Sequence, residues 1–280
     1  MLARCSSGAL RGLGAQAVTV EVDIAPGLPG LQMVGLADAA AQESKERVRA
    51  ALRNAGLRVP LTRVVVNLAP ADLPKTGPGF DLPIALGLLV ASQQLAPEHV
   101  RGIWSAGELG LDGRLRPIRG VLALALAARD RGARALVVPA GNAPEAALVE
   151  GLPVWGADGL GEVVALLRDP HRAGSTTPPA GLAPEPAPAP DLVDVRGQAH
   201  GRRALEIAAA GSHHLLLVGA PGSGKTMLAR RLPPLLPPLT HQEALEVTQL
   251  HSVAGLLGRG PASGASVRSA APITAAPPPP

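Results

Sequence analysis

Gly219-Ala-Pro-Gly-Ser-Gly224-Lys225-Thr226 is a complete match to the Walker A pattern of phosphate-binding loops. The apolar run from His214 to Val218 precedes it and predicts a strand, and residues 227–231 predict the start of a helix. A strand before the loop and a helix after it form the context in which this motif is specific. The stretch therefore predicts a P-loop nucleotide-binding fold around residues 219–226.

The chemistry of phosphate binding explains the residue types in this loop. Its glycines let the backbone turn so that successive N–H groups can face a polyphosphate. Lys225 would reach the β- and γ-phosphates, and Thr226 would offer its hydroxyl to Mg²⁺. A plain glycine-rich turn accounts for neither the lysine nor the flanking elements. We expect ATP and Mg²⁺ to be bound by Gly219, Ala220, Pro221, Gly222, Ser223, Gly224, Lys225 and Thr226.

Composition limits the class of protein. The 280 residues are enough for roughly two domains. Aromatic residues make up only 1%, so the cores must be aliphatic. The single Cys5 excludes an internal disulfide and a cysteine-based zinc motif, which fits a reducing compartment.

Charge and hydropathy give the expected location and partners. No apolar run approaches the roughly 18 residues of a membrane span, and the N-terminus lacks the apolar stretch of a secretory signal. We therefore expect a cytoplasmic protein. The net charge of +4 is a weak indication of a nucleic-acid partner, because few aromatic side chains are available to stack on bases.

Patterning predicts four segments along the chain. Residues 1–168 predict a mixed-sheet α/β domain, with a hairpin around Asp112-Gly113 and a helix capped by Asn142. Residues 169–190 form a proline-rich linker, residues 191–257 begin a P-loop domain, and the low-complexity residues 258–280 are expected to be disordered. The elements expected in the first segment are strands at 18–24, 63–67, 103–107, 114–118, 135–139 and 153–155, and helices at 38–55, 81–93, 121–131, 143–149 and 160–167.

Several stretches resemble the YifB/ComM family of magnesium-chelatase-like AAA+ ATPases. They are Val34-Gly-Leu-Ala-Asp-Ala-Ala, Glu43-Ser-Lys-Glu-Arg-Val-Arg-Ala-Ala-Leu52, Asn67-Leu-Ala-Pro-Ala-Asp-Leu-Pro-Lys75-Thr-Gly-Pro-Gly-Phe-Asp81, Gly197-Gln198 and Arg203-Ala-Leu-Glu-Ile-Ala-Ala-Ala210. The resemblance covers residues 1 to about 257. It implies an N-terminal domain similar to the Lon protease domain and ribosomal protein S5, followed by an AAA+ ATPase domain. The competence-associated members are similar to hexameric ring helicases that drive DNA branch migration.

The Lon resemblance raises peptidase activity as a rival hypothesis. Lon-type peptidases use a serine nucleophile and a lysine base. The matching segments place Gly79 at the serine position and Leu122 near the lysine position. Lys75 and Asp81 then read as a loop lysine and a carboxylate at a helix N-terminus. We therefore expect an inactive peptidase domain that serves as an interaction platform.

The sequence after the P-loop departs from the family. The resemblance implies a Walker B strand, sensor residues and an arginine finger, and residues 227–280 show no counterpart of them. Glu243 and Glu246 are the only acids there, and both fall in a predicted helix that starts with the capping box of Thr240 and Glu243. We expect an ATPase interrupted by truncation or a frameshift. A second hypothesis, a non-catalytic scaffold built on the Lon-like domain, remains open.

Overall fold

The computed structural model describes residues 1–172, 190–237 and 239–257. Within these ranges the chain divides into two compact units. Unit 1 comprises residues 1–172 and 248–257, and unit 2 comprises residues 190–247. Apart from residues 169–172 and 190, the predicted linker lies outside the described residues, as does the predicted tail at 258–280.

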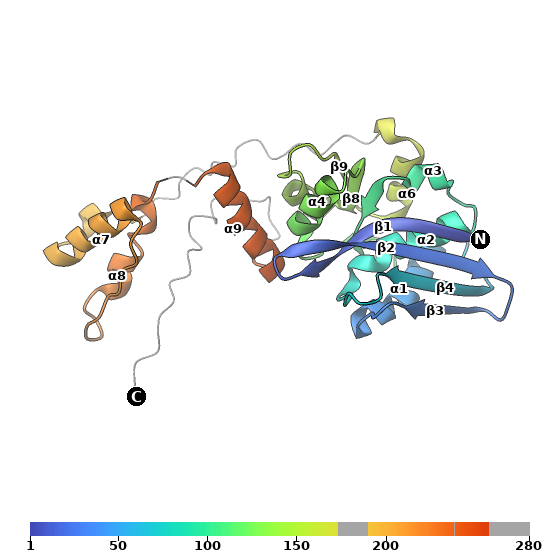
Figure 1. The fold of residues 1–280 in the computed structure, drawn as a ribbon, viewed down its shortest axis with the longest axis horizontal. Coiled ribbons are helices and arrows are strands. Elements are labelled where there is room, and N and C mark those ends of the chain that lie inside the picture. The colour runs from blue at the N-terminus through green and yellow to red at the C-terminus, as the bar shows by residue number, and fades with distance from the viewer. Residues whose placement is uncertain (173–189, 238, 258–280) are drawn as a thin grey trace. The chain divides into compact units, whose positions relative to one another are not determined.

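Unit 1 is built on a seven-stranded mixed sheet with the order β3-β4-β2-β1-β5-β8-β9 (Figure 1). Strand β2 pairs antiparallel with β1 and β4, whereas the pairs β3 with β4, β1 with β5, β5 with β8 and β8 with β9 are parallel. The strands are β1 (Leu2–Arg11), β2 (Gly14–Ala25), β3 (Gly30–Val34), β4 (Arg63–Ala69), β5 (Ile103–Ser105), β8 (Ala135–Pro139) and β9 (Val154–Ala157).

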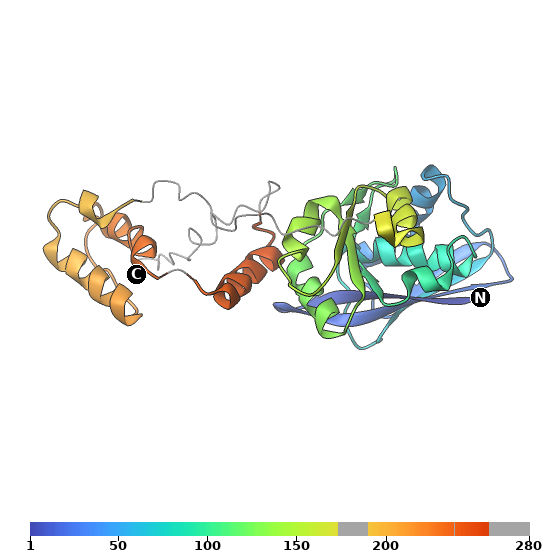
Figure 2. The ribbon, with the colours of Figure 1, turned by 90° about the horizontal axis from the view of Figure 1, so that it is seen from above.

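Helices α2 and α4 pack on β1 and β2, and α1 packs on α2. Seen from above, the blue strands lie along one side and the helices, coloured teal to yellow, along the other (Figure 2). Every residue of α2 is buried, so this helix forms the centre of the core. The helices of unit 1 are α1 (Ala39–Asn54), α2 (Asp81–Ala91), α3 (Pro97–Val100), α4 (Val121–Asp130), α5 (Ala143–Ala146) and α6 (Leu160–Arg168), with short 3₁₀ helices η1 (Pro78–Phe80), η2 (Ala140–Asn142) and η3 (Pro170–Arg172).

Three features of unit 1 differ from the sequence predictions. The hairpin at Asp112-Gly113 joins β6 (Glu108–Leu109) to β7 (Leu115–Arg116), while β5 pairs in the large sheet instead. Asn142 does not cap α5, because its amide binds the backbone N–H and carbonyl of Ile118. Strands β1 and β3 were not predicted, and β1 lies at the middle of the sheet.

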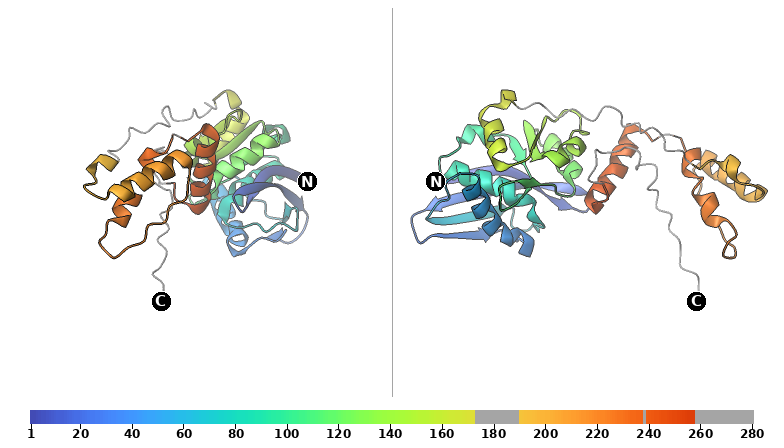
Figure 3. Two further views of the ribbon diagram at one scale, coloured as in Figure 1. Left: turned by 60° about the vertical axis from the view of Figure 1, so that its left-hand side comes forward. Right: turned by 180° about the vertical axis from the view of Figure 1, so that it is seen from behind.

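Unit 2 contains helices and loops but, among its described residues, no strand. Figure 3 shows its orange segments as coiled ribbons and loops. Its elements are η4 (Leu192–Asp194), α7 (Ala199–Gly211), α8 (Lys225–Ala229), η5 (Pro233–Leu235) and the first part of α9 (His241–Ala254), whose second part belongs to unit 1. The prediction of a strand at 214–218 was therefore wrong, because a strand needs a hydrogen-bonded neighbour and none is present among the described residues.

Candidate functional sites

In the P-loop of unit 2, two of the three glycines have a backbone conformation that other residues avoid. Gly222 and Gly224 have φ angles of 80° and 83°, in the left-handed region that favours glycine. A Cβ built at Gly222 would meet nothing within 4 Å, so conformation rather than space requires glycine there. Helix α8 begins at Lys225, so the last two residues of the motif form its first turn.

The ammonium group of Lys225 lies within the curve of the loop. It donates to the carbonyl oxygens of Gly219 at 2.7 Å and Ala220 at 2.8 Å, and to the hydroxyl of Ser223 at 3.3 Å. Residues 219–223 and Thr226 are exposed. The positive charge is therefore placed beside an accessible loop, and the hydroxyl of Thr226 is open to solvent.

Gln198 is a site residue that the motif alone does not reveal. It precedes α7 with a φ of 49°, and its side-chain amide donates to the carbonyl of Ser223 at 3.1 Å. This bond ties the middle of the P-loop to the start of α7. The Gly197-Gln198 pair was among the stretches that resemble the family. The sequence does not show, however, that Gln198 contacts Ser223, which lies 25 residues further along the chain.

The two acids that follow the loop already have partners on α9 or directly before it. A carboxylate oxygen of Glu243 accepts from the backbone N–H and the hydroxyl of Thr240, both at 2.8 Å, which confirms the predicted capping box. These hydrogen bonds lower the pKa of Glu243. Glu246 accepts from the side chain of Gln242 at 3.2 Å.

The two positions that the resemblance to Lon assigns to its dyad, Gly79 and a position near Leu122, lie at the starts of two helices in unit 1. Gly79 is in η1, directly before α2, and Leu122 is in the first turn of α4. Leu122 is fully buried in the core, and its backbone N–H donates to Glu145 at 3.0 Å. Neither a glycine nor a leucine can act as nucleophile or base, so these positions cannot form a Lon-type dyad.

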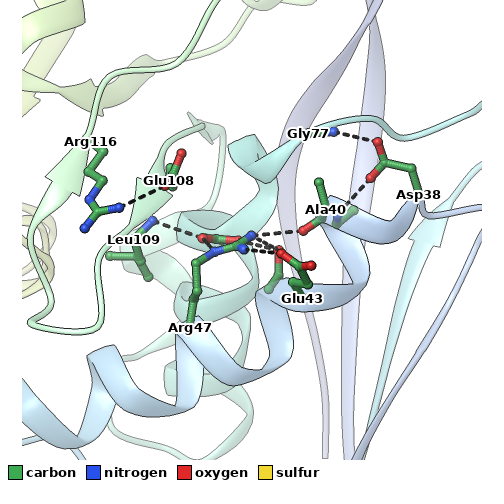
Figure 4. Close-up of polar contacts among 11 residues, drawn as sticks. Asp38, Ala40, Glu43, Arg47, Gly77, Glu108, Leu109 and Arg116 are labelled. Carbon is green, nitrogen blue, oxygen red and sulfur yellow. Dashed lines mark hydrogen bonds and ion pairs between the residues drawn. The ribbon is translucent and has the colours of Figure 1, made fainter.

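Beside Gly79, the carboxylate of Asp81 is the centre of a polar network. Its partners Arg47 and Leu109 are labelled in Figure 4. Asp81 is fully buried and accepts from Arg47 Nε at 2.7 Å, from the backbone N–H of Leu109 at 3.0 Å and from the hydroxyl of Ser44. The hydrogen bond from Arg47 to Asp81 raises the pKa of the guanidinium. The network joins α1, α2 and β6. Asp81 is thus a structural carboxylate with specific partners, beyond the helix-dipole role inferred from sequence.

Two other chemically distinctive side chains of unit 1 are enclosed. The side chain of Lys75 is fully buried, and its ammonium donates to the carbonyl of Pro70. Burial lowers the pKa of Lys75, and the charge of Asp72 opposes that shift. Burial also raises the pKa of Cys5 to about 12, so this thiol stays protonated.

Comparison with known proteins defines the class first. Residues 20–142 match the family described as subunit ChlI of Mg-chelatase, and residues 191–270 match the family described as magnesium chelatase, subunit ChlI. Part of the chain is also 30% identical over 176 residues to the Lon protease of Salinispora arenicola, which covers 58% of this chain and 22% of that protein. The chain is therefore a magnesium-chelatase-like α/β protein with a Lon-like part and the start of a P-loop domain.

Full-length relatives narrow the class further. An uncharacterized protein of Mycobacterium tuberculosis is 51% identical over 256 residues, which is 91% of this chain and 50% of that protein. YifB of Escherichia coli is 45% identical over 86% of this chain and 47% of its own length. The competence protein ComM of Haemophilus influenzae is 44% identical over 90% of this chain and 50% of its own length. The chain belongs to the YifB/ComM family of magnesium-chelatase-like proteins.

The chain spans about half the length of the relatives it matches. Among the described residues, no helix is both long and apolar enough to cross a membrane.

Proposed function

We propose that this chain binds ATP with Mg²⁺ through residues 219–226. The observation that carries the proposal is the arrangement of Lys225, whose ammonium is held at the carbonyl oxygens of Gly219 and Ala220 inside an accessible loop. When a nucleotide binds, the ammonium can replace its hydrogen bonds to these two carbonyls with hydrogen bonds to phosphate oxygens. A phosphate carries more negative charge than a carbonyl, so the exchange is favourable.

The residues of the loop fit a magnesium nucleotide. The left-handed backbone at Gly222 and Gly224 is of the kind that allows successive N–H groups to face a phosphate. Lys225 supplies the positive charge, and the exposed hydroxyl of Thr226 is the oxygen ligand for Mg²⁺. Bound Mg²⁺ would neutralise part of the phosphate charge.

The proposal is limited to binding. Hydrolysis needs a carboxylate that is free to orient Mg²⁺ and water. In the described residues after the P-loop, Glu243 caps its own helix and Glu246 binds Gln242. Neither carboxylate forms a hydrogen bond to the P-loop. The proposal for the described part of this chain is therefore nucleotide binding without hydrolysis.

Thermal unfolding with Mg-ATP tests the proposal. A ligand at about 100 times its dissociation constant stabilises the state that binds it by about 2.7 kcal/mol, so the wild-type melting temperature should rise. The variant Lys225→Ala removes the ammonium from the loop and should show no rise. The control variant Lys45→Ala removes a lysine from α1 in unit 1 instead, and its melting temperature should rise as in the wild type. An unchanged melting temperature in the wild-type chain would contradict nucleotide binding.

The second candidate function is a non-catalytic interaction scaffold built on unit 1. The observation that favours it is the absence of a nucleophile at Gly79 and of a base at Leu122 in an otherwise well-packed Lon-like domain. This reading predicts no response to Mg-ATP, so the same experiment separates the two candidates.

DNA association and assembly into a homo-oligomeric ring are further proposals. They rest on the relationship to the competence protein ComM. The net charge of +4 is compatible with contacts to phosphates. Fluorescence anisotropy of labelled DNA, measured over a range of salt concentrations, tests the association. An isotherm that does not weaken as salt increases would contradict contacts of this kind.

A further inference from the structure

The hairpin of β1 and β2 in unit 1 extends past the strand that pairs with its outer edge. The two strands pair along their whole length, from Leu2 with Asp23 to Arg11 with Gly14. Strand β4 pairs with β2 only as far as Thr19. Figure 1 shows the blue hairpin continuing past the end of β4. Residues 14–18 of β2 therefore pair with β1 on one side and, within the described part of the chain, with no strand on the other.

The free edge begins where the chain leaves β4. Pro70 follows the last residue of β4 and has no N–H with which to continue the ladder. No backbone hydrogen bond joins residues 14–18 to any described segment other than β1. An unpaired strand edge offers N–H and carbonyl groups to another extended polypeptide. A strand added at this edge would continue the line of β4.

A pocket lies beside the free edge. It has a volume of about 410 Å³ and is lined by Gln16 of β2, by the end of β1 and by the loop that follows β4. The volume falls within the range of about 300–1,000 Å³ that is usual for ligand sites. The apolar side chains of its walls are those of Leu10, Pro70, Leu73 and Pro74. The pocket can therefore enclose an apolar group next to the edge of β2.

The loop that forms one wall is held in place before any ligand binds. The side chain of Lys75 is fully buried, and its ammonium donates to the carbonyl of Pro70 across the loop. The backbone N–H of Lys75 donates to the carbonyl of Leu36 at 3.1 Å, and its carbonyl accepts from the N–H of Asp38 at 3.0 Å. A wall that is already ordered costs a ligand less conformational entropy on binding.

One charge at the pocket has no counterpart. The polar side chains of the lining are those of Arg11, Gln16, Asp72 and Thr76, and within the described part of the chain they form no hydrogen bond or ion pair. The negative charge of Asp72 acts on the buried ammonium of Lys75. The guanidinium of Arg11 is then left to a ligand, and its planar fork suits a carboxylate.

We propose that the free edge of β2 and the adjoining pocket bind an extended segment of another polypeptide. Main-chain hydrogen bonds to residues 14–18 supply affinity, an apolar side chain of the segment enters the pocket, and an acidic side chain pairs with Arg11. The inference rests on the second candidate function, because it names the site through which unit 1 acts as an interaction scaffold. It does not require nucleotide in unit 2.

Single-stranded nucleic acid fits this site less well. Its bases bind proteins by stacking on aromatic side chains, and the lining of the pocket contains none. A strand edge also presents N–H donors and carbonyl acceptors in alternation, which matches the main chain of a polypeptide. The observations therefore favour a polypeptide.

Binding of an unfolded polypeptide tests the proposal. The probe is fluorescein-labelled α-lactalbumin whose disulfides are reduced and carboxymethylated, so that it is acidic and keeps extended segments accessible. Fluorescence anisotropy with the full chain should give a saturable isotherm. In the complex, hydrogen exchange of the amides of residues 14–18 should slow by at least about tenfold. Native α-lactalbumin, which is folded, is the control and should not bind.

Two exposed side chains of the site offer variants with matched controls. Gln16→Trp fills the pocket, and Arg11→Glu reverses the charge that has no counterpart. Each should raise the dissociation constant of the unfolded probe by at least about tenfold. Gln32→Trp on β3 and Arg101→Glu before β5 make the same changes at exposed positions that do not line the pocket, and they should bind like the wild type.

The possible failures are distinguishable. An unfolded probe that does not bind to the wild-type chain would count against both the site and the scaffold function. Binding that Gln16→Trp and Arg11→Glu leave unchanged would overturn the site alone. Equal binding of native and unfolded α-lactalbumin would show that an extended segment is not what is recognised. A concentration-dependent dimer that protects residues 14–18 without the probe would identify a second copy of this chain as the occupant, which would also overturn the proposal.

Discussion

Gln198 connects the backbone of the P-loop to the start of α7 through a single side-chain bond. Its amide donates to the carbonyl of Ser223 at 3.1 Å, and Ser223 in turn accepts from Lys225. The loop is exposed, so few other contacts limit its motion. The amide of Gln198 holds the loop in one conformation. A loop without this bond would sample other conformations, and ordering it on binding would lower the affinity for the ligand.

The variant Gln198→Ala should bind Mg-ATP more weakly. Loss of one hydrogen bond typically costs about 0.5–1.5 kcal/mol, which corresponds to a dissociation constant larger by up to about tenfold. Isothermal titration measures the constant directly. Gln242→Ala removes the same side chain from α9 and should leave the constant unchanged. Equal affinities for wild type and Gln198→Ala would show that the bond to Ser223 has no part in binding.

The buried carboxylate of Asp81 should be a major contributor to the stability of unit 1. In Asp81→Asn, Arg47 loses its charged partner in a buried setting, and breaking such a pair costs about 3–5 kcal/mol. The control is Asp112→Asn, because Asp112 and Arg114 form an exposed pair at 3.8 Å, which contributes at most about 1 kcal/mol.

Urea unfolding followed by tryptophan fluorescence measures both Asp81→Asn and its control, because Trp104 and Trp155 lie in unit 1 and are buried. Similar losses for the two variants would argue against a special role for the Asp81 network.

At the scale of elements, the ends of α4, α5 and α9 meet at Glu145. This half-buried side chain of α5 accepts from the backbone N–H of Leu122 at the start of α4 and from the hydroxyl of Ser252 on the part of α9 that belongs to unit 1. Burial raises the pKa of Glu145, and the hydrogen bonds from Ser252, Leu122 and Asn142 oppose the shift. The carboxyl therefore binds its proton more tightly in the folded state than in the unfolded state.

The raised pKa has a defined consequence for stability. A group that holds a proton more tightly when folded stabilises the fold at low pH, and this contribution is lost as pH rises through the folded pKa. The variant Glu145→Gln has no proton to lose at this position. As pH increases above the ordinary glutamate range, the wild type should therefore lose stability relative to the variant. Urea unfolding over a pH series tests this, with Glu150→Gln as an exposed control. A difference that does not vary with pH would contradict it.

Most helices of unit 1 follow from the sequence pattern, and the outcome for strands shows the limit of that pattern. Asp38 caps α1 by accepting from the N–H of Ala41 at 2.7 Å, as predicted. Strand β1 was missed because its inward residues are small, among them Ala3, Cys5 and Ser7. Small side chains give a weak hydrophobic signal.

Packing between the helices and the sheet, which the sequence pattern cannot show, leaves little room at two glycines. A Cβ at Gly8 would lie 2.7 Å from Leu124 of α4, and one at Gly87 of α2 would lie 2.5 Å from Val22 of β2. At these two positions the helices approach the sheet so closely that a larger residue would force a neighbouring side chain to move. The P-loop sequence was recognisable because its residue types are fixed by phosphate chemistry, whereas the contact from Gln198 depends on how the chain folds back.

At the scale of the whole molecule, the two units differ greatly in the size of their cores. The core of unit 1 includes all of α2 and the buried faces of the central strands, whereas the core of unit 2 is a small aliphatic cluster. Stability grows with the share of surface that a unit buries. The units are therefore expected to unfold in separate transitions, unit 2 first.

Calorimetry with and without Mg-ATP tests this prediction. The ligand stabilises the unit that binds it, so the lower transition should move upward while the upper transition stays in place. In Lys225→Ala neither transition should move. A single transition that shifts as a whole would show that the two units unfold cooperatively.

The glycine at position 79 also bears on how this protein can evolve. A Cβ at Gly79 would lie 3.4 Å from the side chain of Ile118, at the near edge of ordinary packing distances, so space does not exclude a small side chain there. Leu122 is fully buried, and a lysine in its place would carry an amine into an aliphatic core. A serine at position 79 and a lysine at position 122 would therefore differ in cost, because only the lysine brings a charge-bearing group into the core.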